Sequence, residues 1–311
     1  MFLDNDGYSR KCIDLMLKCS FSCGQHIETK LKPRLQWLQH VGLSHDQVAK
    51  VVAAFPGILR YSTEQNLKPT VQWLSDFGMS KTQVAKAVAR NPRLLGYSIK
   101  RNLKPTVQWL LGLGLNKAEL AKALASNPQI LGYSIEKNLK PTVQWLLHLG
   151  FNKTQVAKAV AAFPAILGYS IEQNLKPTVQ WLLDLGLSGT QVAKAVAASP
   201  SVLGEHNLKP TVQWLLDVGL SESQVAAAVA SFPNLLTLSI DKNLQPKYSL
   251  LLGAFGHDGA GQLIARDPRI LSYSHQRLTE RLSVLADRNK TKQLASVMSL
   301  PRLDFEKRFS H

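Results

Sequence analysis

The chain has 311 residues, of which 45% are hydrophobic and 19% are charged. That apolar content is too high for a disordered protein, and no apolar run approaches the roughly 18 residues of a membrane-spanning helix. Lysine and arginine number 37 against 21 aspartate and glutamate residues, which gives a formal net charge of +16. A charge of this sign and size favours a polyanionic partner, most often nucleic acid.

The three cysteines, Cys12, Cys19 and Cys23, all lie near the amino terminus. An odd number with no later partner argues against a secreted disulfide framework and favours a reducing compartment. His26 is the nearest further ligand for a zinc site, but the spacings match no common zinc pattern. We therefore expect ordinary thiols here, with no bound metal and no cofactor.

Prolines divide the chain into tandem repeats. All 15 prolines fall into two series in which most neighbours are 36 residues apart, and the six tryptophans follow the same period. The first series is Pro33, Pro69, Pro105, Pro141, Pro177, Pro210 and Pro246, and the second is Pro56, Pro92, Pro128, Pro164, Pro200, Pro233, Pro268 and Pro301. The period is broken once, where Gly204–Asn207 replaces the longer segment Gly168–Asn174. This regularity predicts stacked repeats rather than two globular domains.

The first half of a repeat predicts one amphipathic helix. In the repeat that begins at Asn66, that residue is a plausible N-cap and Pro69 falls in the first turn, where its missing N–H costs little. Val71, Trp73 and the residues that follow form an apolar stripe, which Gly78 ends.

The second half predicts another helix and a short third one. Ser80 and Gln83 form a capping box, and Asn91–Pro92 closes the helix because the residue before proline disfavours the α conformation. Residues 93–98 fit one further helical turn. The box recurs with its first residue at Ser44, Ser80, Asn116, Asn152, Ser188 and Ser221. We therefore predict an all-α solenoid in which the Trp, Leu and Tyr positions form the core between repeats.

The ends of the chain differ from the array. We expect residues 1–30 to form a partial amino-terminal repeat, residues 31–275 an array of about seven repeats, and residues 276–311 a degenerate carboxy-terminal capping repeat. Residues 26–30 align with the tail of a preceding repeat, so the chain is expected to begin partway into an array. No acid-poor transit peptide is visible in residues 1–30.

Two series of lysines follow the repeat. The first series precedes the helix-opening prolines and comprises Lys32, Lys68, Lys104, Lys140, Lys176 and Lys209. The second lies inside the second helix, three residues after the Gln or Glu of the box, and comprises Lys50, Lys86, Lys122, Lys158 and Lys194, with Ala227 interrupting it. Stacking turns each series into a row of evenly spaced cations, which matches the even spacing of phosphates along nucleic acid.

The position of the first lysine series at a helix start gives a second reason to expect phosphate binding. A lysine in the first turn opposes the helix dipole, but the free backbone N–H groups at the same place suit a phosphate. We therefore expect both series to bind the nucleic-acid backbone. The alternative is that these lysines only solvate the outer rim of the array.

The residues that flank the second-series prolines vary from repeat to repeat. Arg93 and Gln129 are of the types that pair with base edges, which permits the hypothesis of one base read per repeat, with Arg93 as its strongest candidate. Gly57 and Ala165 at the same position cannot read a base, and loop residues also drift without function.

The succession of Leu-x-Pro, a Trp-Leu helix ending in Leu-Gly-Leu-Ser, Gln-Val-Ala-Lys-Ala-Val and x-Pro-x-Leu-Leu-x-Tyr-Ser resembles the mTERF family over about residues 31–275. These are the mitochondrial transcription termination factor-like proteins of mitochondria and chloroplasts. The resemblance implies an α-solenoid with two helices and a 3₁₀ turn per repeat. It also implies binding to nucleic acid, commonly duplex DNA, in the regulation or termination of organelle transcription, and a mitochondrial or chloroplast location.

Other solenoids fit less well. PUF and pentatricopeptide repeats have similar lengths but do not require two prolines in each repeat, and repeats like those of TAL effectors would need a Gly-Gly loop that is absent. Because all three classes bind nucleic acid, the broad functional class would survive a wrong family.

Catalysis has little support in the sequence. The eight histidines share no period, and Gly253, Gly256 and Gly259 lack the preceding strand of a phosphate-binding loop. We expect a monomer that is not an enzyme and has no small-molecule substrate or membrane segment, with DNA favoured over RNA. The alternatives are an RNA-binding factor for organelle splicing or RNA processing, and a protein-binding scaffold.

Overall fold

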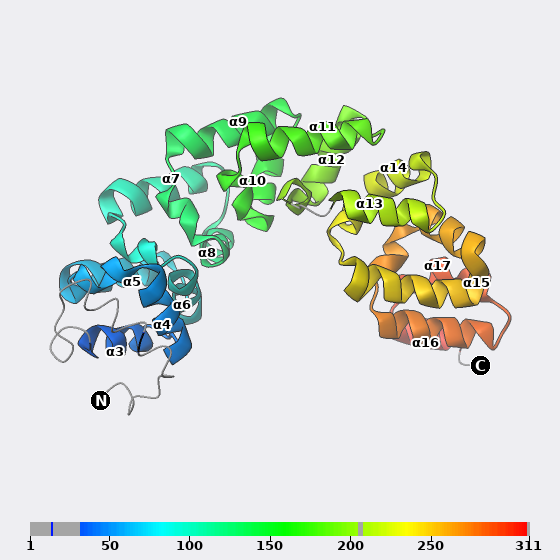
Figure 1. Cartoon of the computed structure of the whole chain (residues 1–311), viewed down its shortest axis with the longest axis horizontal. Coiled ribbons are helices and arrows are strands. Elements are labelled where there is room, and N and C mark those ends of the chain that lie inside the picture. The colour runs from blue at the N-terminus through cyan, green and yellow to red at the C-terminus, as the bar shows by residue number, and fades with distance from the viewer. Residues whose placement is uncertain (1–13, 15–31, 205–207, 310–311) are drawn as a thin grey trace. The chain divides into compact units, whose positions relative to one another are not determined.

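The computed structural model describes residue 14, residues 32–204 and residues 208–309. Helices are the only regular elements in this part of the chain (Figure 1). The prediction of an all-α solenoid built from repeated helix-plus-turn elements is confirmed. The predicted partial repeat, except for Asp14, and all three cysteines lie outside the described residues.

Each repeat begins with two antiparallel α-helices. The first helices are α3 (Lys32–His40), α5 (Lys68–Phe77), α7 (Lys104–Gly112), α9 (Lys140–His148), α11 (Lys176–Asp184) and α13 (Leu208–Asp217). The second helices are α4 (His45–Ala54), α6 (Lys81–Arg90), α8 (Lys117–Ser126), α10 (Lys153–Ala162), α12 (Gly189–Ala198) and α14 (Glu222–Ser231). All six predicted capping boxes form at the second helices, so these helix starts were predicted correctly.

A 3₁₀ turn follows each of the six second helices, and a seventh begins at Pro268, as the prolines predicted. These turns are η2 (Pro56–Arg60), η4 (Pro92–Gly96), η6 (Pro128–Gly132), η8 (Pro164–Gly168), η10 (Pro200–Gly204), η11 (Pro233–Thr237) and η13 (Pro268–Ser272). The residue before each proline leaves the α region, as Asn91 does with φ −139° and ψ 86°.

A π-helical turn between the 3₁₀ turn and the next first helix was not predicted. These turns are η3 (Thr63–Leu67), η5 (Ile99–Leu103), η7 (Ile135–Leu139), η9 (Ile171–Leu175) and η12 (Ile240–Leu244). Each runs directly into an α-helix, so the helical segment begins at Ser62 rather than at Asn66. Asn66 is not the N-cap: its side-chain oxygen accepts the backbone N–H of Ser62, and the Ser62 hydroxyl accepts that of Gln65.

The array ends in longer and less regular helices. In α15 (Gln245–Arg266), Gly256 has φ 68° and ψ 178°, so this helix is kinked where the other repeats turn. It is followed by α16 (His275–Ala286), η14 (Thr291–Gln293), α17 (Leu294–Met298) and α18 (Arg302–Phe309). The assignment of residues 276–311 to a capping repeat stays a prediction.

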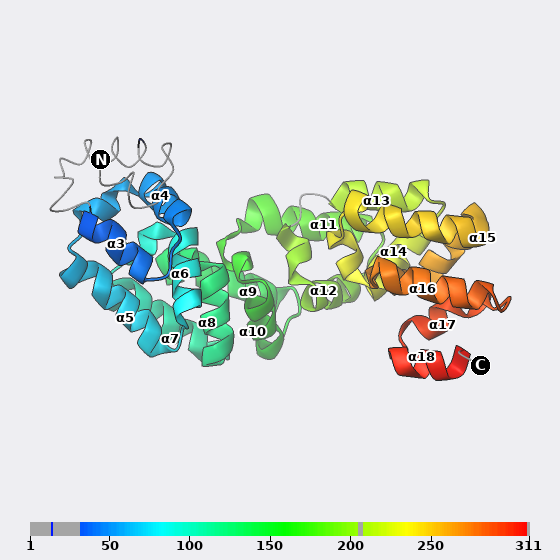
Figure 2. The same cartoon turned by 90° about the horizontal axis from the view of Figure 1, so that it is seen from below.

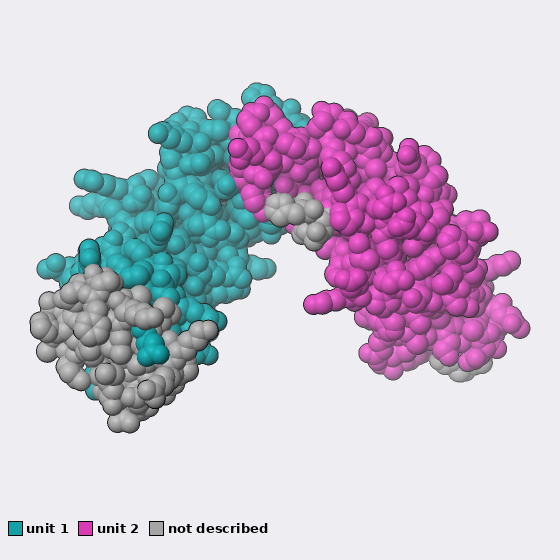
Figure 3. Space-filling model, in the orientation of Figure 1, with its two compact units in different colours: residues 1–168 teal, residues 169–311 magenta. Residues whose placement is uncertain are grey.

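Contacts divide the chain into two compact units, unit 1 (residues 1–168) and unit 2 (residues 169–311) (Figure 3). In unit 1 the second helices α4, α6, α8 and α10 pack on one another in chain order (Figures 1 and 2). Within unit 1 these helices lie on the inner side of the curve that the successive repeats describe (Figure 1). In unit 2, α12 packs on α14, α14 on α15, and α15 on α16.

Leucine, valine and alanine fill the core, and the prediction that the tryptophans are core residues is wrong for five of the six. Leu67, Leu74 and Leu103 are fully buried, whereas Trp37, Trp73, Trp109, Trp145 and Trp181 are half-buried. Consecutive residues on a helix point about 100° apart, so the ring next to a buried leucine lies at the edge of the buried face. Trp214 is the exception, because its Nε1 donates to Gln245 Oε1 over 2.8 Å and its ring packs edge-on against Tyr248.

Tyrosines and glycines of neighbouring repeats approach each other closely. A Cβ atom added at Gly96 would lie 2.7 Å from the Tyr61 hydroxyl oxygen, nearer than real Cβ atoms come to another heavy atom. At Gly132 and Gly168 the added atom would be closer still to the preceding repeat's tyrosine. The pairs in unit 1 are Tyr61–Gly96, Tyr97–Gly132 and Tyr133–Gly168. The tyrosines are therefore half-buried spacers between repeats.

Lys247 is buried at the position that holds threonine in the five preceding repeats, with 4% of its surface exposed. Its Nζ donates to Asn243 Oδ1 over 2.5 Å and to the Leu271 carbonyl over 2.6 Å, which ties α15 to η13. Burial lowers the pKa of this lysine below its usual value.

Replacing Gly132 with alanine should lower the free energy of unfolding by about 1–3 kcal/mol, because the new methyl group overlaps the Tyr97 ring. Gly112→Ala is the control: nothing lies within 4 Å of its added Cβ, so stability should stay or rise by up to about 1 kcal/mol. Tyr97→Leu should remove most of the Gly132→Ala penalty. Urea unfolding followed by circular dichroism measures these three variants and the double variant Gly132→Ala, Tyr97→Leu, and strictly additive effects in the double variant would contradict the close approach.

The pH dependence of stability should report on Lys247. Between its lowered pKa and the ordinary value of about 10.5, the unfolded chain holds the Lys247 proton more tightly than the folded chain does. The free energy of unfolding should therefore rise with pH in this range, and Lys247→Met should lose that rise. Urea titrations of both proteins from about pH 8 to 10.5 make the comparison. Parallel pH profiles would show that the charged form is not penalised by burial.

Candidate nucleic-acid interface

Four lysines of the first series, Lys68, Lys104, Lys140 and Lys176, lie where a π-helical turn passes into a first helix, and three of these four are neutralised locally. Lys140 Nζ lies 3.2 Å from Glu136 Oε2 and Lys176 Nζ lies 2.5 Å from Glu172 Oε1. Lys68 forms the same pair with Glu64. These are exposed i,i+4 ion pairs that contribute about 0.2–0.5 kcal/mol each. A phosphate at these three lysines would have to compete with a carboxylate.

The predicted free N–H groups beside these lysines are not present. The backbone N–H of Lys68 donates to the Thr63 carbonyl, and that of Lys104 donates to the Ile99 carbonyl. Because the π-helical turn extends the helix by one turn, these lysines also lie away from the positive end of the helix dipole. Lys68, Lys104, Lys140 and Lys176 therefore do not lie beside the free helix-start N–H groups that the sequence predicted.

Lys104 differs from these three in the residue that lies one helical turn before it. Lys32 is half-buried, while Lys104 and Lys209 are exposed. Lys104 has Lys100 four residues before it, where the neighbouring repeats have glutamate. The residue four positions earlier decides whether Lys68, Lys104, Lys140 or Lys176 is neutralised, and the sequence prediction did not take it into account.

The second lysine series is exposed and faces away from the core. In α6 the buried residues are Val84, Ala85, Ala87 and Val88, and two residues along a helix turn the side chain by about 200°. Lys86 therefore lies opposite the buried face. Within residues 32–204, no second-series lysine forms an ion pair or a side-chain hydrogen bond; these are Lys50, Lys86, Lys122, Lys158 and Lys194.

Four second-series lysines belong to one stack. Lys50, Lys86, Lys122 and Lys158 lie on α4, α6, α8 and α10, which pack consecutively on the inner side of unit 1 (Figure 1). The stack turns a 36-residue sequence period into a row of charges on one layer of helices. Lys194 lies on α12 in unit 2, and Ala227 takes the equivalent position on α14.

The positions that flank the second-series prolines divide into two kinds. The residue before the proline takes part in packing in several repeats: the Phe55 ring lies 6.0 Å from that of Tyr61, and Asn91 Nδ2 donates to the Tyr97 hydroxyl over 3.5 Å. The residue after the proline is more open, and Arg93 is exposed. Of the two flanking positions, only the second remains suited to reading bases.

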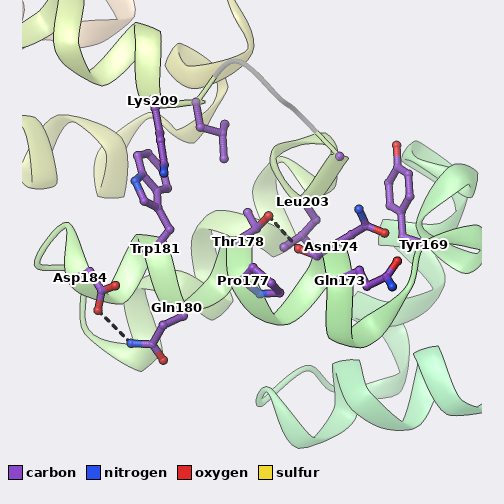
Figure 4. Close-up of a pocket in the computed structure, with 12 residues that line it drawn as sticks. Tyr169, Gln173, Asn174, Pro177, Thr178, Gln180, Trp181, Asp184, Leu203 and Lys209 are labelled. Carbon is purple, nitrogen blue, oxygen red and sulfur yellow. Dashed lines mark hydrogen bonds between the residues drawn. The ribbon is translucent and has the colours of Figure 1, made fainter.

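A cavity of about 520 Å³ lies in unit 2 at the shortened repeat (Figure 4). Trp181, Tyr169 and Lys209 line it together with the amides of Gln173 and Asn174. Figure 4 shows the Lys209 side chain reaching toward the Trp181 ring. The corresponding ring of Trp214 contacts Gln245 and Tyr248 and is buried, whereas Trp181 is half-buried.

A sequence model of the mTERF family matches residues 3–306. The chain belongs to the mTERF family. This family consists of nucleic-acid-binding repeat proteins connected with organelle transcription, and it is not in general enzymatic. No curated protein matches the chain. None of the described helices is long and apolar enough to cross a membrane.

Proposed function

We propose that this mTERF-family chain binds the phosphate backbone of nucleic acid through its second lysine series, and that duplex DNA in an organelle is its ligand. The observation that carries the proposal is the row of unneutralised lysines on α4, α6, α8 and α10. Exposed lysines without carboxylate partners contribute little to folding, whereas a row of them matches the repeating charge of a phosphate backbone.

The first series contributes less to this interface. At Lys68, Lys140 and Lys176 the adjacent glutamates already offset the charge, so displacement of each carboxylate would reduce the gain from phosphate binding. The two series therefore form a matched comparison inside one protein.

The biological role proposed is the regulation or termination of organelle transcription, in mitochondria or chloroplasts. It is supported by family membership together with a net charge of +16. The chain is proposed to act as a monomer, without a cofactor or a small-molecule substrate. Base reading through Arg93 and its equivalents is the proposed source of any sequence preference.

RNA is the second candidate ligand, and the tryptophans favour it. Aromatic side chains with an accessible face stack on unpaired bases, and five of the six tryptophans are half-buried rather than buried. Such stacking needs a single strand, whereas the lysine row serves duplex and single strand alike. Competition between duplex DNA and single-stranded RNA decides between the two ligands.

Neutralising three lysines of each series tests the proposal. The triple variant Lys86→Ala, Lys122→Ala, Lys158→Ala should bind labelled duplex DNA more weakly, with a salt slope less steep by about 2–3 because each lost phosphate contact removes about 0.9. The matched variant Lys68→Ala, Lys140→Ala, Lys176→Ala has the same net charge and should bind more tightly than the first. Fluorescence anisotropy across a salt series measures both.

Equal losses in the two variants would mean that total charge rather than the second series governs binding. No binding of the unmodified chain to duplex DNA or to single-stranded RNA at about 50 mM salt, where such contacts are strong, would overturn the proposed function.

A further inference from the structure

One repeat reverses the charge at the junction between the π-helical turn and the first helix. The second residue of the π-helical turn is acidic in the other described turns, namely Glu64, Glu136, Glu172 and Asp241. In η5 it is Lys100, and Arg101 follows it. The segment from Ser98 to Lys104 therefore holds three cations and no carboxylate. We call these three residues, Lys100, Arg101 and Lys104, the cationic junction.

The backbone at this junction is the same as in the neighbouring repeats. The Arg101 N–H donates to the Ser98 hydroxyl over 3.2 Å, and the Ser98 N–H donates to Asn102 Oδ1 over 3.2 Å. The equivalent bonds at Ser134 are 3.1 and 3.2 Å long. The reversal therefore changes the charge of the surface without changing the structure beneath it.

The reversed charge does not stabilise the fold. Lys100 and Arg101 lie in the first turn of the helical segment, where the dipole favours acidic residues, as the other repeats have. Lys100 and Lys104 are like charges at i and i+4, where Lys140 has an attractive partner instead. All three side chains are exposed, and within residues 32–204 none has an ion-pair partner.

We propose that the cationic junction is an anchor for phosphate groups of the nucleic-acid backbone, and the strongest contact within the first lysine series. This inference rests on the proposed function and names the repeat at which the backbone is held most tightly. The guanidinium of Arg101 pairs with two phosphate oxygens, and the two lysines supply point charges beside it. With its charge compensated by phosphates, the junction loses the repulsion that it has in the free protein.

Lysine and glutamate can be exchanged at equivalent positions of neighbouring repeats, which gives two reciprocal variants. Lys100→Glu gives η5 the glutamate of its neighbours, so Lys104 becomes paired and the anchor is lost. Glu136→Lys does the reverse in η7, where Lys137 and Lys140 are already in place. Lys100→Glu should weaken duplex DNA binding at least tenfold at about 50 mM salt and make the salt slope less steep by about 2, while Glu136→Lys should strengthen binding.

Two controls separate the loss of the phosphate anchor from a change in net charge and from unfolding. Lys292→Glu makes the same change in net charge at an exposed lysine of η14 in unit 2, and it should cost much less affinity. Lys100→Glu restores a favourable first turn, so its thermal unfolding temperature should not fall, and lost binding cannot be attributed to unfolding.

The outcomes are distinct. If Lys100→Glu binds DNA as well as the unmodified chain while the second-series triple variant does not, the anchor is wrong and the proposed function stands. If Lys100→Glu weakens binding to a polyglutamate peptide but leaves DNA binding unchanged, the junction serves an acidic protein and the anchor is overturned. If the unmodified chain binds no nucleic acid, both proposals fail.

Discussion

The closest approach between successive repeats of unit 1 is that of a tyrosine ring to a glycine of the next repeat, where the ring occupies the space that a side chain would need. The sequence of the later repeats agrees with this constraint, because tyrosine and glycine are lost together there. The shortened repeat has no tyrosine after Gly204, and the next repeat then has Thr237 in place of glycine. Leu238 replaces the next tyrosine, and Ser272 follows in place of glycine. Glycine is thus retained where a ring of the preceding repeat requires it.

The stacking of equivalent helices gives the surface charges of unit 1 their regularity. The helices α4, α6, α8 and α10 pack on one another, so the second-series lysines that recur every 36 residues form a row on one layer of helices. Whether a lysine is available then depends on its immediate neighbours. At Lys140 a glutamate one turn earlier supplies the compensating charge, and at Lys104 the same position carries another cation. Lys86 has no ion-pair partner among residues 32–204.

Much of the fold was predictable because its signals are local. Ser80 and Gln83 bond to each other's backbone within four residues, and Pro92 restricts only its own neighbourhood, so both predictions are confirmed. The π-helical turn was missed because Asn66, which precedes a proline-opened helix, resembles an N-cap. In the structure Asn66 Oδ1 instead accepts the Ser62 N–H inside a π-helical turn, a rare helix type. The exposure of Trp73 was missed because a half-buried ring at the edge of an apolar stripe has the same sequence pattern as a core ring.

The lysine positions were correctly located on their helices, but their partners were not anticipated. The pairing of Lys68 with Glu64 was accessible from sequence only once the two residues were known to share a helix. Before the π-helical turn was seen, Glu64 lay in an apparent loop and Lys68 at an apparent helix start. The free N–H groups predicted beside Lys68, Lys104, Lys140 and Lys176 depended on that assignment, and they are not free in the structure.

Lysine acetylation with and without duplex DNA, read by mass spectrometry, tests the account most directly, because it reports each amine in the same sample. We expect DNA to protect Lys86, Lys122 and Lys158 together with Lys100 and Lys104, and to leave Lys68, Lys140 and Lys176 reactive. Uniform protection of all eight, or protection of the ion-paired lysines alone, would contradict the claim that unneutralised lysines on this solenoid bind the phosphate backbone.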